Sequence, residues 1–154
     1  MSRAGPAGLI VARRMRSYPR KLATEIAMAE AKVHTGGCHC GNVRYEVTSD
    51  LAQVTSCNCS ICSKLGALWI FVSPQEFSLT TGQDNLGDAG QDSVGDYQFH
   101  KKVIHHRFCP VCGIESFAQG QMPDGTPMFA VNVRCLDDVD VWTLSVTPID
   151  GKSF

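Results

Sequence analysis

Apolar and polar positions after residue 33 follow the short, alternating pattern of β-strands rather than the longer period of helices. Residues 43–48 and 77–80 alternate between apolar and polar side chains, and residues 68–72 form one continuous apolar run. Further strands are predicted at residues 103–108, 115–118, 128–133 and 139–146. Only residues 60–66 indicate a helical turn, and five prolines interrupt the rest. The pattern therefore predicts a mainly β domain of short strands with its cysteine clusters in the loops.

The length of the chain fits one domain of ordinary size. Of its 154 residues 44% are apolar, which is enough for a core, and we assign residues 33–154 to this domain. Residues 82–96 are rich in glycine and aspartate but lack the ligand spacing of an EF-hand, so we expect a solvated loop there. No apolar run approaches the length of a membrane span, so a membrane partner is not expected.

Charge is distributed unevenly along the chain. Residues 1–32 carry seven Lys/Arg and two acids, a net +5, whereas residues 33–154 carry seven Lys/Arg and thirteen acids, a net −6. The basic segment has three interpretations: a miscalled start upstream of Met28, a disordered tail, or a transit peptide. We assign it no chemistry. An acidic domain is poorly suited to a phosphate backbone, so nucleic acid is not an expected partner.

Seven of the eight cysteines fall in three tight clusters. The clusters are Cys38 and Cys40, then Cys57, Cys59 and Cys62, then Cys109 and Cys112, with Cys135 alone behind them. Thiolates one or two residues apart converge on one tetrahedral centre, so this spacing predicts zinc. Four disulfides in a small secreted domain are the alternative. The N-terminus lacks an apolar run of signal-peptide length, so we expect a reducing compartment, the cytoplasm.

Two of these clusters predict a closed zinc site. The Cys109-Pro110-Val111-Cys112-Gly113 segment has the form of a zinc knuckle, in which glycine lets the backbone fold back toward the thiolates. One knuckle supplies only two ligands, and we expect Cys38 and Cys40 to supply the others. Such a site would tie the start of the domain to its later half.

Cys57, Cys59 and Cys62 then remain as a group of three thiols. If Cys135 completes them, the second site is also closed and the protein is a binding module. If Cys135 is instead a small buried hydrophobic residue, which is the common role of a free cysteine, one zinc position is open. An open zinc with three thiolates suits the capture of a substrate thiol better than the activation of water.

Four segments together resemble the glutathione-dependent formaldehyde-activating enzyme family, which includes centromere protein V. They are residues 37–45 (GCHCGNVRY), 57–62 (CNCSIC), 108–113 (FCPVCG) and 132–136 (NVRCL). The resemblance spans about residues 34–150. It implies a β-tent fold with two zinc ions, one structural and one catalytic. The implied ligands are Cys38, Cys40, Cys109 and Cys112 for the first ion and Cys57, Cys59 and Cys62 for the second.

The family activity is the condensation of formaldehyde with glutathione to S-hydroxymethylglutathione, which in the reverse direction is a carbon–sulfur lyase reaction. The resemblance thus implies a small thiol such as glutathione as co-substrate. Lys64, two residues after the triple, is our first candidate to bind it. His105 and His106 can transfer protons, but strand alternation lets at most one of them face the site. A non-enzymatic zinc module that binds another protein is the alternative function, and chromatin binding is a third.

Overall fold

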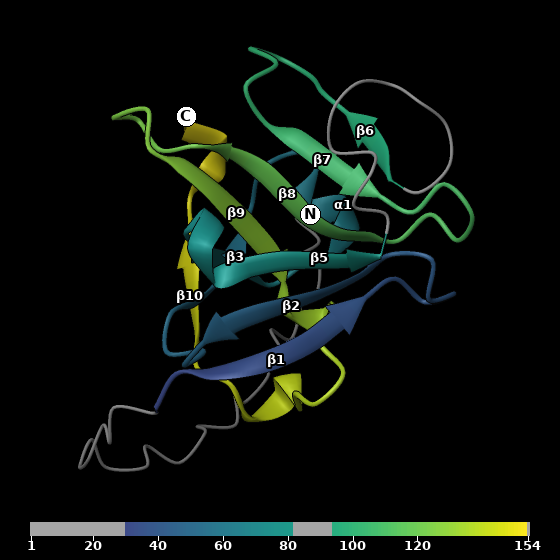
Figure 1. Ribbon diagram of the computed structural model, residues 1–154. Helices are drawn as coiled ribbons and strands as arrows, with labels where there is room; N and C mark the ends of the chain where they lie inside the picture. The colour runs from purple at the N-terminus through teal and green to yellow at the C-terminus, as the bar shows by residue number, and fades with distance from the viewer. Residues whose placement is uncertain (1–29, 82–93, 154) are drawn as a thin grey trace, which may run out of the picture.

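The computed structural model describes residues 30–81 and 94–153, which form two sheets of short strands (Figure 1). The smaller sheet has the order β1-β2-β5, with β1 at Lys32–Gly37, β2 at Arg44–Ser49 and β5 at Phe77–Thr81. The larger sheet has the order β10-β3-β4-β9-β8-β7-β6. Its strands are β3 (Val54–Cys57), β4 (Trp69–Val72), β6 (Gly95–Tyr97), β7 (His105–Phe108), β8 (Glu115–Gln121), β9 (Pro127–Asn132) and β10 (Val146–Ile149).

The predicted fold class, a mainly β domain of the β-tent type, is confirmed. Strand pairs in both sheets are antiparallel except β3 with β10, which run parallel. The predicted helical turn is also present as α1 (Cys62–Leu65), which ends at Gly66. No helix among residues 30–81 and 94–153 is long and apolar enough to cross a membrane.

The strand predicted at residues 139–146 is wrong. Its middle forms a 3-10 helix, Val141–Thr143, and β10 begins only at Val146. The side chain of Asp140 accepts a hydrogen bond from the backbone N–H of Trp142, which gives the backbone a local alternative to strand pairing. Of the expected loop at residues 82–96, residues 82–93 lie outside the described residues, and its last two residues belong to β6. Most of the basic segment, residues 1–29, also lies outside them.

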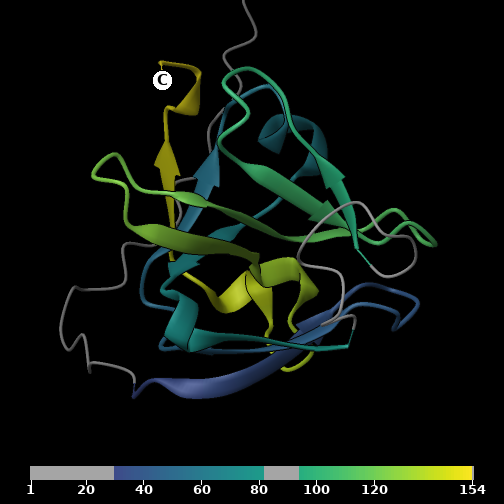
Figure 2. The same cartoon turned by 45° about the horizontal axis from the view of Figure 1, so that its top comes forward.

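The two sheets pack face to face (Figure 2), and aromatic side chains from both meet in the core between them. Tyr45 of β2 and Phe77 of β5 face Phe117 of β8 and Phe129 of β9, and the rings of Phe77 and Phe129 stack at 4.4 Å. The buried hydroxyl of Tyr45 donates to the backbone carbonyl of Ser116, 3.3 Å away. Such ring pairs add about 0.5–1.5 kcal/mol each beyond the burial of their area. This cluster fixes the sheets, and with them the loops that carry the cysteines.

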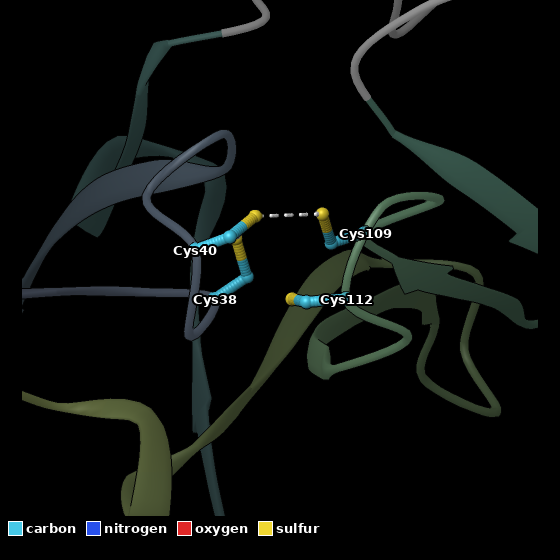
Figure 3. Close-up of side chains that lie close together, drawn as sticks. All are labelled: Cys38, Cys40, Cys109 and Cys112. Atoms are coloured by element: carbon cyan, nitrogen blue, oxygen red, sulfur yellow. Dashed lines mark hydrogen bonds between the residues drawn. The ribbon is translucent and has the colours of Figure 1, made fainter.

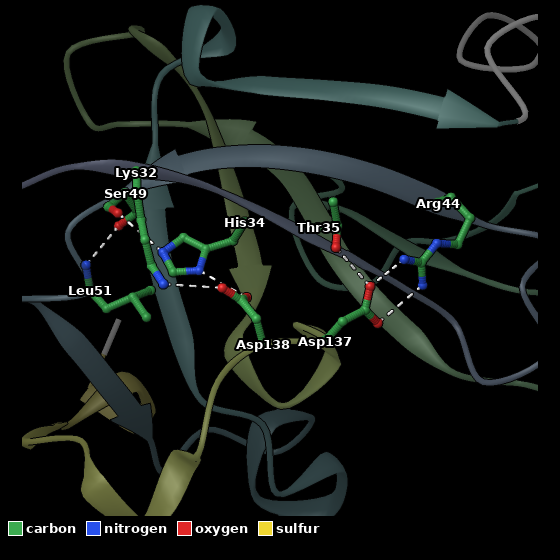
Figure 4. Close-up of polar contacts among 8 residues, drawn as sticks. All are labelled: Lys32, His34, Thr35, Arg44, Ser49, Leu51, Asp137 and Asp138. Atoms are coloured by element: carbon green, nitrogen blue, oxygen red, sulfur yellow. Dashed lines mark hydrogen bonds and ion pairs between the residues drawn. The ribbon is translucent and has the colours of Figure 1, made fainter.

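Two consecutive aspartates hold the segment after β9 against β1 and β2 (Figure 4). Asp137 accepts two hydrogen bonds from the guanidinium of Arg44 and one from the hydroxyl of Thr35. Asp138 faces the buried ring of His34 at 3.0 Å. The hydrogen bond from Arg44 lowers the pKa of Asp137, and the one from His34 lowers that of Asp138. These contacts fasten the segment between β9 and β10 to the smaller sheet.

Candidate metal sites and the adjoining pocket

Four cysteine thiols from two different sheets face one another. Cys38 and Cys40 lie in the turn between β1 and β2 of the smaller sheet, and Cys109 and Cys112 lie in the turn between β7 and β8 of the larger one (Figure 3). The four Sγ atoms lie within 4.8 Å of one another, and Cys40 is 3.6 Å from both Cys38 and Cys109. Four sulfurs around one zinc are about 3.8 Å apart for bonds of about 2.3 Å, so the spacing fits that ion.

The backbone turns that carry these thiols have matching geometry. Gly41 and Gly113 follow the two cysteine pairs with φ of 87° and 77°, in the left-handed region that favours glycine. The N–H of Gly113 donates to the carbonyl of Cys109 at 2.8 Å, and the N–H of Val43 donates to the Sγ of Cys38 at 3.2 Å. The backbone therefore folds back at both turns, as the sequence predicts for the knuckle.

The thiols of the four-cysteine cluster differ in pKa. Backbone N–H groups of Ile114 and Cys40 lower the pKa of Cys112 to about 6. A hydrogen bond from the backbone of Asn42 lowers the pKa of Cys40, but partial desolvation and the neighbouring thiols together raise it to about 12. Thiolates this close repel one another, so all four are deprotonated together only around a cation. Four soft sulfur ligands in a tetrahedral arrangement suit a zinc ion.

Cys57, Cys59 and Cys62 form a second group whose Sγ atoms also lie within 4.8 Å of one another. Cys57 ends β3 and Cys62 begins α1, so one short loop carries all three. The backbone N–H of Cys59 donates to the Sγ of Cys57 at 3.4 Å, and the indole N–H of Trp69 donates to the Sγ of Cys62 at 3.3 Å. Burial raises the pKa of Cys62 to about 12 despite this indole contact. Three thiols of this kind fit a zinc site with one free position.

Cys135 lies beside the first cluster rather than in the second. It shares a surface hollow with Cys38 and Cys40, and the electrostatic influence of Cys38 and Cys112 reaches it. Burial is the main cause that raises its pKa to about 11, which favours a neutral thiol. All eight cysteines are free, so the disulfide alternative receives no support.

A pocket of about 580 Å³ opens beside the second group of thiols, and Cys59 is part of its wall. Its lining also includes the polar side chains of Ser60, His100, Lys101, His106 and Lys152. Lys64 is exposed on α1 and does not line this pocket. The pocket thus brings cations from the β6–β7 connection and the C-terminus toward a thiol group, an arrangement that the order of residues in the sequence does not reveal.

The C-terminal turn fastens the loop of the three thiols. Asn58 donates to the carboxylate of Asp150 at 2.6 Å and accepts from the backbone N–H of Lys152 at 3.0 Å. Gly151 lies so close to Cys57 that a Cβ at this position would approach its Sγ well inside 3.0 Å. Sequence reasoning missed these residues, because β10 and β3 are far apart in the chain and only their parallel pairing brings them together.

His105 and His106 point to opposite sides of β7, as strand alternation predicts. His105 contacts Asp96 at 2.8 Å and lines a hollow away from the cysteines. His106 is buried, lines the pocket of Cys59, and contacts Glu115 at 2.8 Å. Glu115 is the partner that sequence reasoning missed, since only the β7–β8 pairing places it there.

Comparison with known proteins gives two results. Residues 33–148 match the model of the family described as glutathione-dependent formaldehyde-activating enzyme. A crystal structure of a Rhodobacter sphaeroides protein is similar at 29% identity and a TM-score of 0.61, over 74% of this chain and 97% of that one. The family match covers most of the chain and all seven clustered cysteines. The chain therefore belongs to the glutathione-dependent formaldehyde-activating enzyme family.

Proposed function

We propose that the protein is a zinc enzyme that joins a glutathione-type thiol to formaldehyde and, in reverse, cleaves the carbon–sulfur bond of the adduct. Family membership supports an enzyme that acts in glutathione and formaldehyde chemistry. In this proposal Cys38, Cys40, Cys109 and Cys112 hold a structural zinc that fastens the two sheets together. Cys57, Cys59 and Cys62 hold a second zinc, which would keep a substrate sulfur in its thiolate form.

The division of the thiols into a group of four and a group of three carries the proposal. A closed four-thiolate site has no position for a substrate, whereas a three-thiolate site has one. The alternative function, a non-enzymatic interaction module, needs Cys135 as the fourth ligand of the second site. Cys135 lies instead beside Cys38 and Cys112, which favours the enzyme. The eight free thiols fit a reducing compartment, and the cytoplasm stays our expected location.

The pocket beside Cys59 suits the rest of a glutathione-type thiol. Such a molecule carries two carboxylates, and the exposed side chains of Lys101 and Lys152 stand in the pocket wall to receive them. The two lysines lie on separate segments, so they can contact two separated carboxylates. The role expected of Lys64 stays a prediction, and its place outside this wall makes it the natural comparison.

The test measures the exchange of formaldehyde between water and glutathione by NMR, with zinc-loaded protein and with none. We expect exchange above the uncatalysed rate, and its loss in Cys59→Ser with the first zinc retained. Lys101→Ala and Lys152→Ala should each raise the KM for glutathione by roughly 5- to 50-fold, as loss of a charge-assisted contact predicts. Lys64→Ala tests the binding role that the sequence predicts for Lys64 against that of the two pocket lysines. A fully zinc-loaded wild type that leaves the exchange rate unchanged would refute the proposed function.

A further inference from the structure

His106, in the wall of the pocket that contains Cys59, forms a buried pair with Glu115. His106 of β7 and Glu115 of β8 are joined by a contact of 2.8 Å between Nδ1 and Oε1, and each side chain is only 7% exposed. A polar pair so far from water is costly to bury, and the aromatic core does not require it. The position of His106, in a pocket wall that it shares with Cys59, points to a chemical role for the pair.

The environment fixes the orientation of the His106 ring. A carboxylate accepts hydrogen bonds and donates none, so the Nδ1 that faces Glu115 carries the proton and the neutral ring keeps its lone pair on Nε2. Phe99 stacks on the ring at 5.4 Å, and Tyr97 lies 6.2 Å from it. Within residues 30–81 and 94–153 no side chain or backbone group hydrogen-bonds Nε2. An oriented imidazole with one free nitrogen is the usual arrangement of a general base.

We propose that His106 is the proton-transfer residue of the thiol–aldehyde reaction and that Glu115 positions it, an inference that rests on the proposed function. Nε2 accepts the proton that the substrate thiol loses as it enters the pocket. The sulfur then forms a bond to the aldehyde carbon while the carbon–oxygen π bond breaks. His106 returns the proton to that oxygen, which gives the S-hydroxymethyl product. The proton taken equals the proton returned, so no further reactant is needed, and cleavage follows the same steps in reverse.

Three other ionisable side chains around the pocket differ from His106 in exposure and in their partners. His100, Lys101 and Lys152 also line it, but all three are exposed, and no carboxylate of the described residues orients them. His105 is the matched control, because it neighbours His106 on the same strand and has its own acid partner, Asp96, on the other side of the sheet.

The experiment compares His106→Asn, Glu115→Gln and His105→Asn in the zinc-loaded protein. We expect His106→Asn to lower kcat by about 10²-fold or more while the Kd for glutathione, measured by calorimetry, changes less than about threefold. Glu115→Gln should lower kcat by a smaller factor, and His105→Asn should leave it unchanged. Circular dichroism and zinc content show whether each variant is folded. If His106→Asn does not fold, the activity of Glu115→Gln and the NMR measurement decide whether His106 transfers the proton.

A second readout does not depend on turnover. In ¹⁵N NMR of the wild type we expect His106 to carry its proton on Nδ1, and Glu115→Gln to shift the ring toward the other tautomer. Glutathione without aldehyde should perturb the Nε2 signal of His106 and leave that of His105 in place. An active wild type whose rate survives His106→Asn within threefold, or a His106 protonated on Nε2 alone, would overturn the inference but not the proposed function. An inactive, zinc-loaded wild type would overturn both.

Discussion

Gly151→Ala is expected to disturb the second thiol group without touching the first. The new Cβ would lie well inside 3.0 Å of the Sγ of Cys57 and 3.3 Å from the Cβ of Cys59, whereas relaxed heavy-atom contacts are about 3.5–4.0 Å. The φ of Gly151 is outside the left-handed region, so the backbone itself accepts alanine and the clash is the whole effect. Overpacking of this size costs about 1–3 kcal/mol, equivalent to roughly a 5- to 150-fold loss of affinity at the second zinc.

The assay is competition for zinc with a chromophoric chelator, which resolves a tight and a weaker ion. Gly151→Ala should weaken only the weaker ion and raise the KM for glutathione, because the C-terminal turn also brings Lys152 to the pocket. Gly125→Ala, in the turn between β8 and β9, is the matched control. Alanine would be strained at its φ of 86°, but nothing lies within 4 Å of the added Cβ, so this variant tests a glycine change without a clash. Equal zinc affinities in Gly151→Ala and the wild type would refute the packing of this turn against Cys57.

Three further predictions concern the rest of the domain. Cys109→Ser should unfold the protein as well as release zinc, because structural zinc supplies about 10–16 kcal/mol of binding energy to folding. Cys59→Ser should stay folded with one ion bound. Circular dichroism and zinc analysis distinguish the two outcomes. Cys135→Ala should keep both ions by mass spectrometry and lose at most about 1–2 kcal/mol in urea unfolding. Arg44 lowers the pKa of Asp137, so the stabilisation exists above the unfolded pKa, near 4, and is lost as pH falls; urea unfolding of Arg44→Ala should therefore depend less on pH between 5 and 3 than that of the wild type.

Much of the fold can be read from the sequence because its strands follow the alternation of side chains. The residues that form β2, β4 and β9 alternate or run apolar, and the strands appear close to where the pattern predicts them. β6 could not be predicted, since three residues are too few for a period and only its pairing with β7 stabilises it. The segment after Asp140 alternates like a strand but forms a 3-10 helix, because the Asp140 side chain caps the start of that helix.

The cysteine groups were predictable for a different reason. Ligands one or two residues apart in the chain are necessarily close in space, so each pair and the triple can be recognised whatever the fold. The meeting of the two pairs depends on the fold, because the turns that carry them lie about 70 residues apart. The residues around them are supplied by distant strands: Glu115 reaches His106 through the β7–β8 pairing, and Gly151 reaches Cys57 through the parallel β3–β10 pairing. Local spacing contains no information on such contacts. The wall of the pocket, including Lys152, was therefore beyond sequence reasoning.

The central claim, an open zinc that takes a substrate sulfur at Cys57, Cys59 and Cys62, is tested most directly by X-ray absorption at the zinc edge. The protein is loaded with zinc and measured alone, with glutathione, and with the analogue in which selenium replaces the glutathione sulfur. We predict two zinc ions per chain, seven cysteine sulfurs shared between them, and a zinc–selenium shell that appears with the analogue and is absent in Cys59→Ser. Two ions that are fully ligated by protein sulfur, with no selenium shell in the wild type, would contradict the account.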